Sequence, residues 1–129
     1  MGTFQKFEEI NAWQKARTLA NEIYMLTGCG TFSKDYALID QMRRSCISVI
    51  SNIAEGYERD GKKEFAHFLF IAKGSCGELK AQPQIAFDQK YIDVENFHKL
   101  YNLANETGRM IGCLIGYLKR TSVKGSKVK

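Results

Sequence analysis

Apolar residues recur at intervals of three and four positions in four stretches of the chain, which is the spacing of one face of an α-helix. The first stretch runs from about residue 8 to residue 27, and Gly28 and Gly30 end it. Its stripe consists of small and aliphatic residues, Ala12, Ala16, Leu19, Ile23 and Leu26. The second stretch, residues 35–59, has two neighbouring stripes, so its apolar arc must be covered on more than one side.

The third predicted helix begins near Lys62 and contains a proline. Its apolar stripe is formed by Phe65, Leu69, Ala72, Cys76 and Leu79. Pro83 lies inside this pattern and lacks a backbone donor, so we expect it to kink or interrupt the helix. The fourth helix is predicted from Asp93, a good N-cap, and its stripe continues to Leu118.

Four amphipathic helices with short connections predict an all-α fold, an antiparallel up-down-up-down four-helix bundle. The chain of 129 residues has the length of one domain, and we assign residues 1–121 to it. Residues 122–129 have no apolar periodicity, and we expect them to form a basic, disordered tail.

The positive charge of the chain is concentrated at its end. The formal net charge is +5, but residues 119–129 alone carry five bases and no acid, so the preceding residues are neutral overall. A neutral body with a basic tail indicates nucleic acid less strongly than a basic face would. The candidates for nucleic-acid contacts are Arg43, Arg44, Arg59, Lys62, Lys63, Lys119 and Arg120.

Cysteine spacing and hydropathy indicate the compartment. The four cysteines form no C-x-x-C zinc or redox motif, and we expect them to be reduced packing residues. The first residues lack the apolar core of a signal peptide. The apolar run at residues 110–118 is too short for a membrane helix. These features predict a cytoplasmic protein with no membrane partner.

Two Glu-x-x-His motifs, Glu64/His67 and Glu95/His98, are the sharpest indication of enzyme chemistry, because di-iron bundles use such pairs. Both motifs lie in the first turns of antiparallel helices, so about 35 Å would separate them within one subunit. We therefore expect no catalytic residues, no metal and no cofactor in the subunit. A metalloenzyme site assembled between subunits is a third hypothesis, behind the two given below.

The second helix carries polar and apolar residues beyond those that a small core needs. Asn52 falls near its buried side, where it needs partners and could fix the register between helices. Glu55 and Arg59 lie one turn apart and could pair within or between subunits. Surplus apolar surface usually marks an interface, so we expect self-association. The residues expected there are Ile47, Ile50, Tyr57, Phe70, Gly74 and Gly77.

Residues 40–59, DQMRRSCISVISNIAEGYER, are similar to the signature QLRRAAxSIPSNIAEGxxR of a family of four-helix-bundle proteins. The family is named for reading frames inside intervening sequences of bacterial 23S ribosomal RNA genes. Residues 7–16 resemble its opening FEDLxVWQKA, and residues 62–75 resemble its KKEFxxFLxIAxGS. The resemblance covers most of the chain, and the run Ser51–Gly56 is specific.

The resemblance implies assembly into a ring, typically a homopentamer, and it brings no catalytic residues. Relatives include the accessory protein of diversity-generating retroelements, which works with a reverse transcriptase and RNA. Ile50 stands where the family usually has proline, and Pro83 where it usually has leucine. The family's characteristic positions, which we interpret as structural or interfacial, correspond to Arg43, Arg44, Asn52, Glu55 and Gly56.

The first functional hypothesis is a non-enzymatic, ring-forming scaffold that binds RNA or a ribonucleoprotein partner. The alternative is a protein–protein adaptor with no affinity for nucleic acid.

Overall fold

The computed structural model describes the backbone of residues 4–128 and the side chains of residues 4–121. It contains four long helices: α1 (Asn11–Thr27), α2 (Tyr36–Glu58), α3 (Lys62–Asp88) and α4 (Val94–Val128). Two short 3₁₀ helices, η1 (Phe7–Glu9) and η2 (Gly30–Lys34), precede α1 and α2. The tail predicted at residues 122–129 lies outside the described side chains, so this boundary stays a prediction.

Side-chain caps fix the starts of two helices. The Asp35 carboxylate accepts a hydrogen bond from the Leu38 N–H at 3.1 Å, and Asp93 accepts one from the Asn96 N–H at 2.8 Å. The predicted N-cap at Asp93 is thus confirmed. The first helix begins at Asn11 rather than near residue 8, because Ile10 is extended and its side chain is buried in the core.

Pro83 does not interrupt α3, so of the two expected outcomes, a kink or an interruption, the interruption is wrong. The helix continues through Pro83 to Asp88, and the proline side chain is buried. A proline removes one backbone donor, which is a local cost that packing can offset. Leu79 and Ala86, one turn away on either side, are fully buried and hold the backbone in place. Ile50, where the family usually has proline, lies within the unbroken helix α2.

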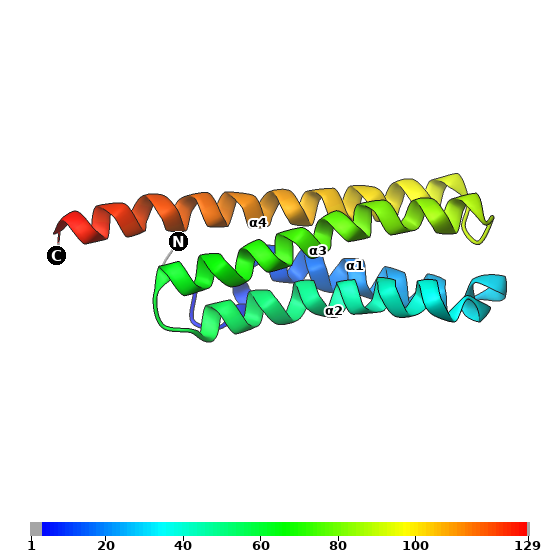
Figure 1. Cartoon of the computed structure of the whole chain (residues 1–129), viewed down its shortest axis with the longest axis horizontal. Helices are drawn as coiled ribbons and strands as arrows, with labels where there is room; N and C mark the ends of the chain where they lie inside the picture. The colour runs from blue at the N-terminus through cyan, green and yellow to red at the C-terminus, as the bar shows by residue number, and fades with distance from the viewer. Residues whose placement is uncertain (1–3, 129) are drawn as a thin grey trace.

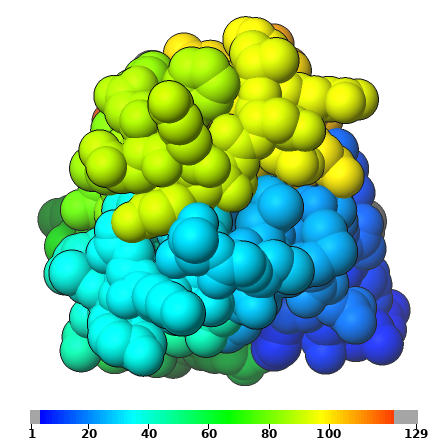
Figure 2. All heavy atoms as spheres, turned by 90° about the vertical axis from the view of Figure 1, so that its right-hand side faces the viewer, coloured from blue at the N-terminus to red at the C-terminus, as the bar shows by residue number. Residues whose placement is uncertain are grey.

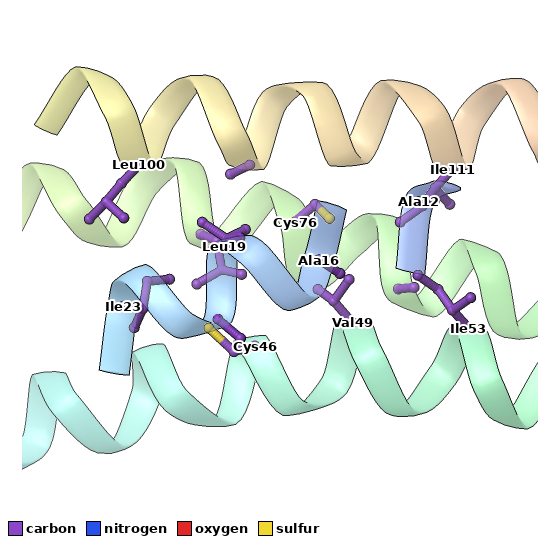
Figure 3. Close-up of a cluster of buried hydrophobic side chains, with 14 of the residues drawn as sticks. Ala12, Ala16, Leu19, Ile23, Cys46, Val49, Ile53, Cys76, Leu100 and Ile111 are labelled. Carbon is purple, nitrogen blue, oxygen red and sulfur yellow. The ribbon is translucent and has the colours of Figure 1, made fainter. Parts of the chain in front are cut away.

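The helices form an antiparallel four-helix bundle, as predicted (Figure 1). Each helix packs against two neighbours, α1 against α2 and α4, and α3 against α2 and α4. Viewed from one end, α3 and α4 form a layer above α1 and α2 (Figure 2). The core lies between these layers, and side chains from all four helices meet there, including Leu19, Val49, Cys76 and Leu100 (Figure 3).

The end of the bundle shown in Figure 2 is closed by the α1–α2 connection packing against the α3–α4 connection. The buried ring of Phe32 stacks on Tyr91 with centroids 5.0 Å apart. The Tyr91 hydroxyl donates to the Asp35 carboxylate at 2.9 Å, and this bond raises the pKa of Tyr91. Among the described helices, none combines the length and apolar character needed to cross a membrane.

Candidate nucleic-acid interface

The three arginines predicted on α2 are engaged inside the subunit. Arg43 donates from Nε and Nη2 to the Thr27 hydroxyl at 3.1 and 2.9 Å, and its guanidinium lies 4.4 Å from the Tyr24 ring centroid. Arg44 pairs with Asp40, and Arg59 pairs with Glu55, each at 2.8 Å. The expected Glu55–Arg59 pair therefore forms within one subunit.

Asn52 bonds to its own helix instead of to a neighbouring one. Its amide donates to the Ser48 carbonyl at 2.8 Å and to the Ser48 hydroxyl at 3.1 Å. Serines make the side-chain hydrogen bonds between α2 and α3. The Ser75 hydroxyl donates to Ser48 at 2.7 Å, and Ser45 donates to Glu78 and accepts from Gln82, each at 3.2 Å. The expectation that Asn52 itself fixes the helix register is corrected accordingly, since a serine at position 48 supplies the acceptor one turn earlier.

Three of the residues expected at an interface are used within the subunit. Gly56 is buried, and a Cβ there would lie 2.8 Å from Phe68 Cβ, so only glycine fits where α2 crosses α3. The Tyr57 hydroxyl donates to the Phe4 carbonyl at 2.6 Å. Ile50 is half-buried against the core.

The other expected interface residues lie on the surface, but not on one face. Ile47 on α2 and Phe70 on α3 are exposed by 52% and 49%. Ile47 lines a hollow with Tyr24 and Tyr36, whereas Phe70 lines another between α3 and α4. Gly74 and Gly77 lie on the exposed surface of α3, and no atom lies within 4 Å of a Cβ built at either.

A groove of about 590 Å³ runs between α3 and α4 on the outside of the bundle. Its floor is made of small residues, with Gly108, Gly112 and Gly116 recurring every four positions on α4. A Cβ at Gly112 would lie 3.3 Å from Lys73 Cε, and one at Gly116 would lie 3.4 Å from Arg120 Nη1. The glycines therefore let long cationic side chains lie across the groove.

Basic side chains surround this groove. Lys73, Lys80, Arg109 and Arg120 line it, and a second hollow between the same helices adds Lys62, Lys63 and Lys119. We call this set the basic face: Lys62, Lys63, Lys73, Lys80, Arg109, Lys119 and Arg120. Within the described residues, no acidic side chain lines either hollow, and no member of the basic face forms an ion pair.

The basic face contains four of the predicted cations and three that sequence reasoning missed. The missed residues are Lys73, Lys80 and Arg109. A signal was present, since Lys73 and Lys80 lie two helical turns apart on α3 and the glycine repeat lies on α4. The sequence alone does not show which faces of α3 and α4 lie next to each other.

The cysteines divide into two classes. Burial raises the pKa of Cys46 and of Cys76 to about 12, so both remain thiols at neutral pH. Cys29 and Cys113 are exposed, and Cys113 lines the basic groove. All four are free. The expected packing role holds for the buried Cys46 and Cys76, but it is wrong for Cys29 and Cys113, because their side chains are exposed.

The two Glu-x-x-His motifs lie where the sequence placed them, in the first turns of α3 and α4. Over the described residues, no group of three or more His, Cys, Asp or Glu side chains is arranged to hold a metal ion. The chemistry that this surface offers is therefore the binding of anions by lysine and arginine.

A model of the 23S rRNA-intervening sequence protein family matches residues 8–113. The chain belongs to this family. The matched range includes Lys73, Lys80 and Arg109 and ends before Lys119 and Arg120. The basic face of this family member thus lies partly inside and partly beyond the region that defines the family.

The fold is similar to the crystal structure of a protein with unknown function from the S23 ribosomal protein family of Bacteroides thetaiotaomicron. The two chains are 21% identical with a TM-score of 0.74, and the match covers 81% of this chain and 95% of the other. At this identity the likeness shows a shared fold. The comparison with curated proteins gives no match.

Proposed function

We propose that this protein is a non-enzymatic, cytoplasmic scaffold that forms a ring and binds RNA through the basic face. The observation that carries the proposal is the set of seven cations between α3 and α4, with no acidic residue lining the hollows that they surround within the described residues. Each lysine or arginine that neutralises a phosphate releases a condensed counterion, which favours binding at low salt. The four free cysteines fit a reducing compartment.

The state of the cations favours the basic face over α2 as the RNA-binding surface. Arg43, Arg44 and Arg59 would have to leave partners within the subunit before they could contact a phosphate. The side chains of the basic face have no acidic partner among the described residues to give up. A phosphate bound there gains charge-assisted hydrogen bonds without breaking existing ones.

Exposed apolar side chains on α2 and α3 support the ring. Ile47 is exposed by 52%, Ile71 by 42% and Ile85 by 49%. A closed ring joins two different surfaces of each subunit, so separate apolar patches on two helices suit it. Following the resemblance to ring-forming relatives, we propose a homopentamer, in which the basic face is repeated around the axis. Light scattering at micromolar concentration tests this, and a monomeric mass contradicts the ring.

The decisive experiment compares two triple variants that remove the same charge. The test variant is Lys73→Gln, Lys80→Gln and Arg109→Gln, and the matched control is Arg43→Gln, Arg44→Gln and Arg59→Gln. We expect the test variant to weaken binding of a single-stranded RNA by roughly 10- to 100-fold at moderate salt. Its salt dependence, the slope of log K against log salt, should fall by about 2, because three phosphate contacts are lost. The control should bind within a few-fold of the wild type.

Equal losses in the two triple variants would show that RNA responds to net charge alone and would contradict an interface on the basic face. Absence of RNA binding by the wild-type protein over the whole salt series would overturn the RNA-binding function. That second outcome would leave the protein–protein adaptor as the function to test.

The exposed cysteines provide an independent map of the site. Bound RNA should protect Cys113, which lines the groove, from alkylation. Cys29, at the α1–α2 connection, is the internal control and should react at the same rate with and without RNA. Protection of both thiols or of neither would contradict this placement of the RNA.

A further inference from the structure

We propose that Phe70 and Tyr101 are stacking positions for nucleobases, so that the basic face takes single-stranded rather than duplex nucleic acid. This inference rests on the RNA-binding function proposed above. Phe70 is exposed by 49% and Tyr101 by 38%, so both rings present accessible surface to a ligand. Both belong to the two helices that form the basic face.

Each ring lies beneath a lysine from the opposite helix. Lys119 Nζ of α4 is 4.7 Å from the centroid of Phe70 on α3, and Lys80 Nζ of α3 is 5.6 Å from the centroid of Tyr101 on α4. Both pairs therefore bridge the same pair of helices. Phe70 and Lys80 are ten residues apart on α3, and Tyr101 and Lys119 are eighteen apart on α4, so the two pairs are separated by roughly 15–27 Å along the two helices.

These pairs can exchange partners when RNA binds. A cation above an exposed aromatic ring is held weakly, because water solvates the ammonium almost as well. A nucleobase covers the ring with a larger apolar surface, and stacking of this kind tolerates any base. The displaced ammonium then lies beside the sugar–phosphate backbone that carries the base, where a phosphate is a stronger partner than the ring.

Tyr24 is another exposed aromatic residue, but its ring is unsuited to stacking. Tyr24 is also covered by a cation, but Arg43 is fixed there by two hydrogen bonds to the Thr27 hydroxyl. No such bond fixes Lys80 or Lys119 among the described residues. Lysine chains above Phe70 and Tyr101 are thus free to move, whereas the arginine above Tyr24 is not.

Stacking on these rings requires bases that are not already stacked on each other. In a duplex the bases are enclosed by pairing and stacking, and only the backbone and groove edges remain accessible. In a single strand the base faces are available. The combination of unpaired cations with two exposed rings therefore selects a single strand.

The test measures three RNA probes of about 12 nucleotides by fluorescence anisotropy: an oligouridylate, the same strand with abasic positions, and a duplex. The test variants are Phe70→Leu and Tyr101→Leu, which keep apolar bulk. Tyr36→Leu is the matched control, because Tyr36 is an exposed tyrosine on α2, away from the basic face. Light scattering of each variant checks that its mass equals that of the wild type.

We expect each test variant to weaken binding of the oligouridylate by roughly 5- to 100-fold and to leave binding of the abasic strand unchanged. Tyr36→Leu should change neither. If the wild type binds the abasic strand or the duplex as tightly as the oligouridylate, stacking is overturned while RNA binding stands. A changed mass for Phe70→Leu would place Phe70 at a subunit interface and overturn its stacking role. If no probe binds, the proposed function itself fails.

Discussion

The outer surface of α2 and the basic face between α3 and α4 both carry lysine or arginine side chains, yet these are organised in opposite ways. Arg43 and Arg44 on α2 and Arg59 at its C-cap each have a partner within the subunit, and Gly56 is covered by α3. On the basic face, Lys73 and Arg120 lie over the half-buried glycines Gly112 and Gly116. The helix with the family's specific sequence run therefore holds the bundle together, and a less distinctive pair of helices carries the surface proposed to bind RNA.

The contrast shows that glycines in this chain serve two different purposes, close packing of helices and room for a cationic side chain. Gly56 belongs to the specific run of residues 51–56, and its role in this structure is to let α2 and α3 approach closely. Gly112 belongs to a simple repeat, and its role is to make room for the Lys73 side chain. A residue can thus be characteristic because of packing, and packing alone gives no indication of a ligand.

The largest effect on stability is expected from Gly56→Ala. The new methyl group would lie 2.8 Å from Phe68 Cβ and 3.2 Å from the Phe65 carbonyl oxygen, so the helices must move apart. Overpacking of this kind lowers the free energy of unfolding by about 1–3 kcal/mol. Gly74→Ala is the matched control and should raise it by about 0.5–1 kcal/mol, because the site is open and alanine favours the helix. Urea denaturation measures both, and equal effects would remove the distinction between the two glycines.

The cysteine thiols test the contrast between buried and exposed regions through the pH dependence of the free energy of unfolding. Burial raises the pKa of Cys46 and Cys76 from 9.0 to about 12, so the folded state keeps protons that the unfolded state releases. Their contribution is complete below pH 9 and is lost as pH rises toward 12. From pH 8 to about pH 9.5 the free energy of unfolding should fall by about 1–2 kcal/mol for the two thiols together.

The control for this pH dependence is the double variant Cys46→Ala and Cys76→Ala, which should show a flatter fall in stability over the same range. A second readout is thiol alkylation of the native protein at neutral pH, in which Cys29 and Cys113 should react before either core cysteine. An unchanged pH slope in the double variant would show that other groups cause the alkaline loss.

A smaller effect on the free energy of unfolding should distinguish Arg43, which is hydrogen-bonded within the subunit, from Lys80 on the basic face. Arg43→Met removes the bonds to Thr27 that tie α2 to the end of α1, and it should lower the free energy of unfolding by about 0.5–1.5 kcal/mol. Lys80→Met should change it by less than about 0.5 kcal/mol. RNA affinity should respond in the reverse order. Parallel denaturation and binding titrations measure both quantities, and a stability loss in Lys80→Met equal to that in Arg43→Met would break the comparison.

The smallest effect is expected from Gly112→Ala in the groove floor. Its methyl group would lie 3.3 Å from Lys73 Cε, a flexible atom that can move by a few tenths of an ångström. Stability should therefore change by less than about 1 kcal/mol, with the helix propensity of alanine in its favour. RNA affinity should fall by a few-fold as Lys73 is displaced. An affinity equal to that of the wild type would show that the position of Lys73 in the groove is unimportant.

Much of the fold could be read from the periodicity of apolar residues. Four helices in antiparallel order were predicted, and the cap at Asp93 was confirmed because a side-chain cap is a local interaction. Of the kink or interruption predicted at Pro83, the interruption was wrong because burial of Leu79 and Ala86 on either side outweighs one missing backbone donor. The start near residue 8 was early because Ile10 reaches the core from an extended backbone.

The candidate site was predicted less well. Of the seven cations named from the sequence, four lie on the basic face, and the three on α2 are held by Thr27, Asp40 and Glu55. Charge counting placed the excess of bases in residues 119–129, but five of the seven cations of the basic face precede this segment. Lys73, Lys80 and Arg109 lie among neutral or mixed sequence, so no local run of charge marks them.

The sequence by itself determined which residues form helices and which stripe of each helix is buried, because both depend on the spacing of apolar positions along one segment. Only the tertiary structure decided which cations are paired and which are open. That outcome depends on the faces that two helices turn toward each other, as when α1 brings Thr27 to Arg43 and α4 brings its glycines beneath Lys73. Lysine and arginine side chains are available to bind an anion only where the packing leaves them without a partner in the subunit.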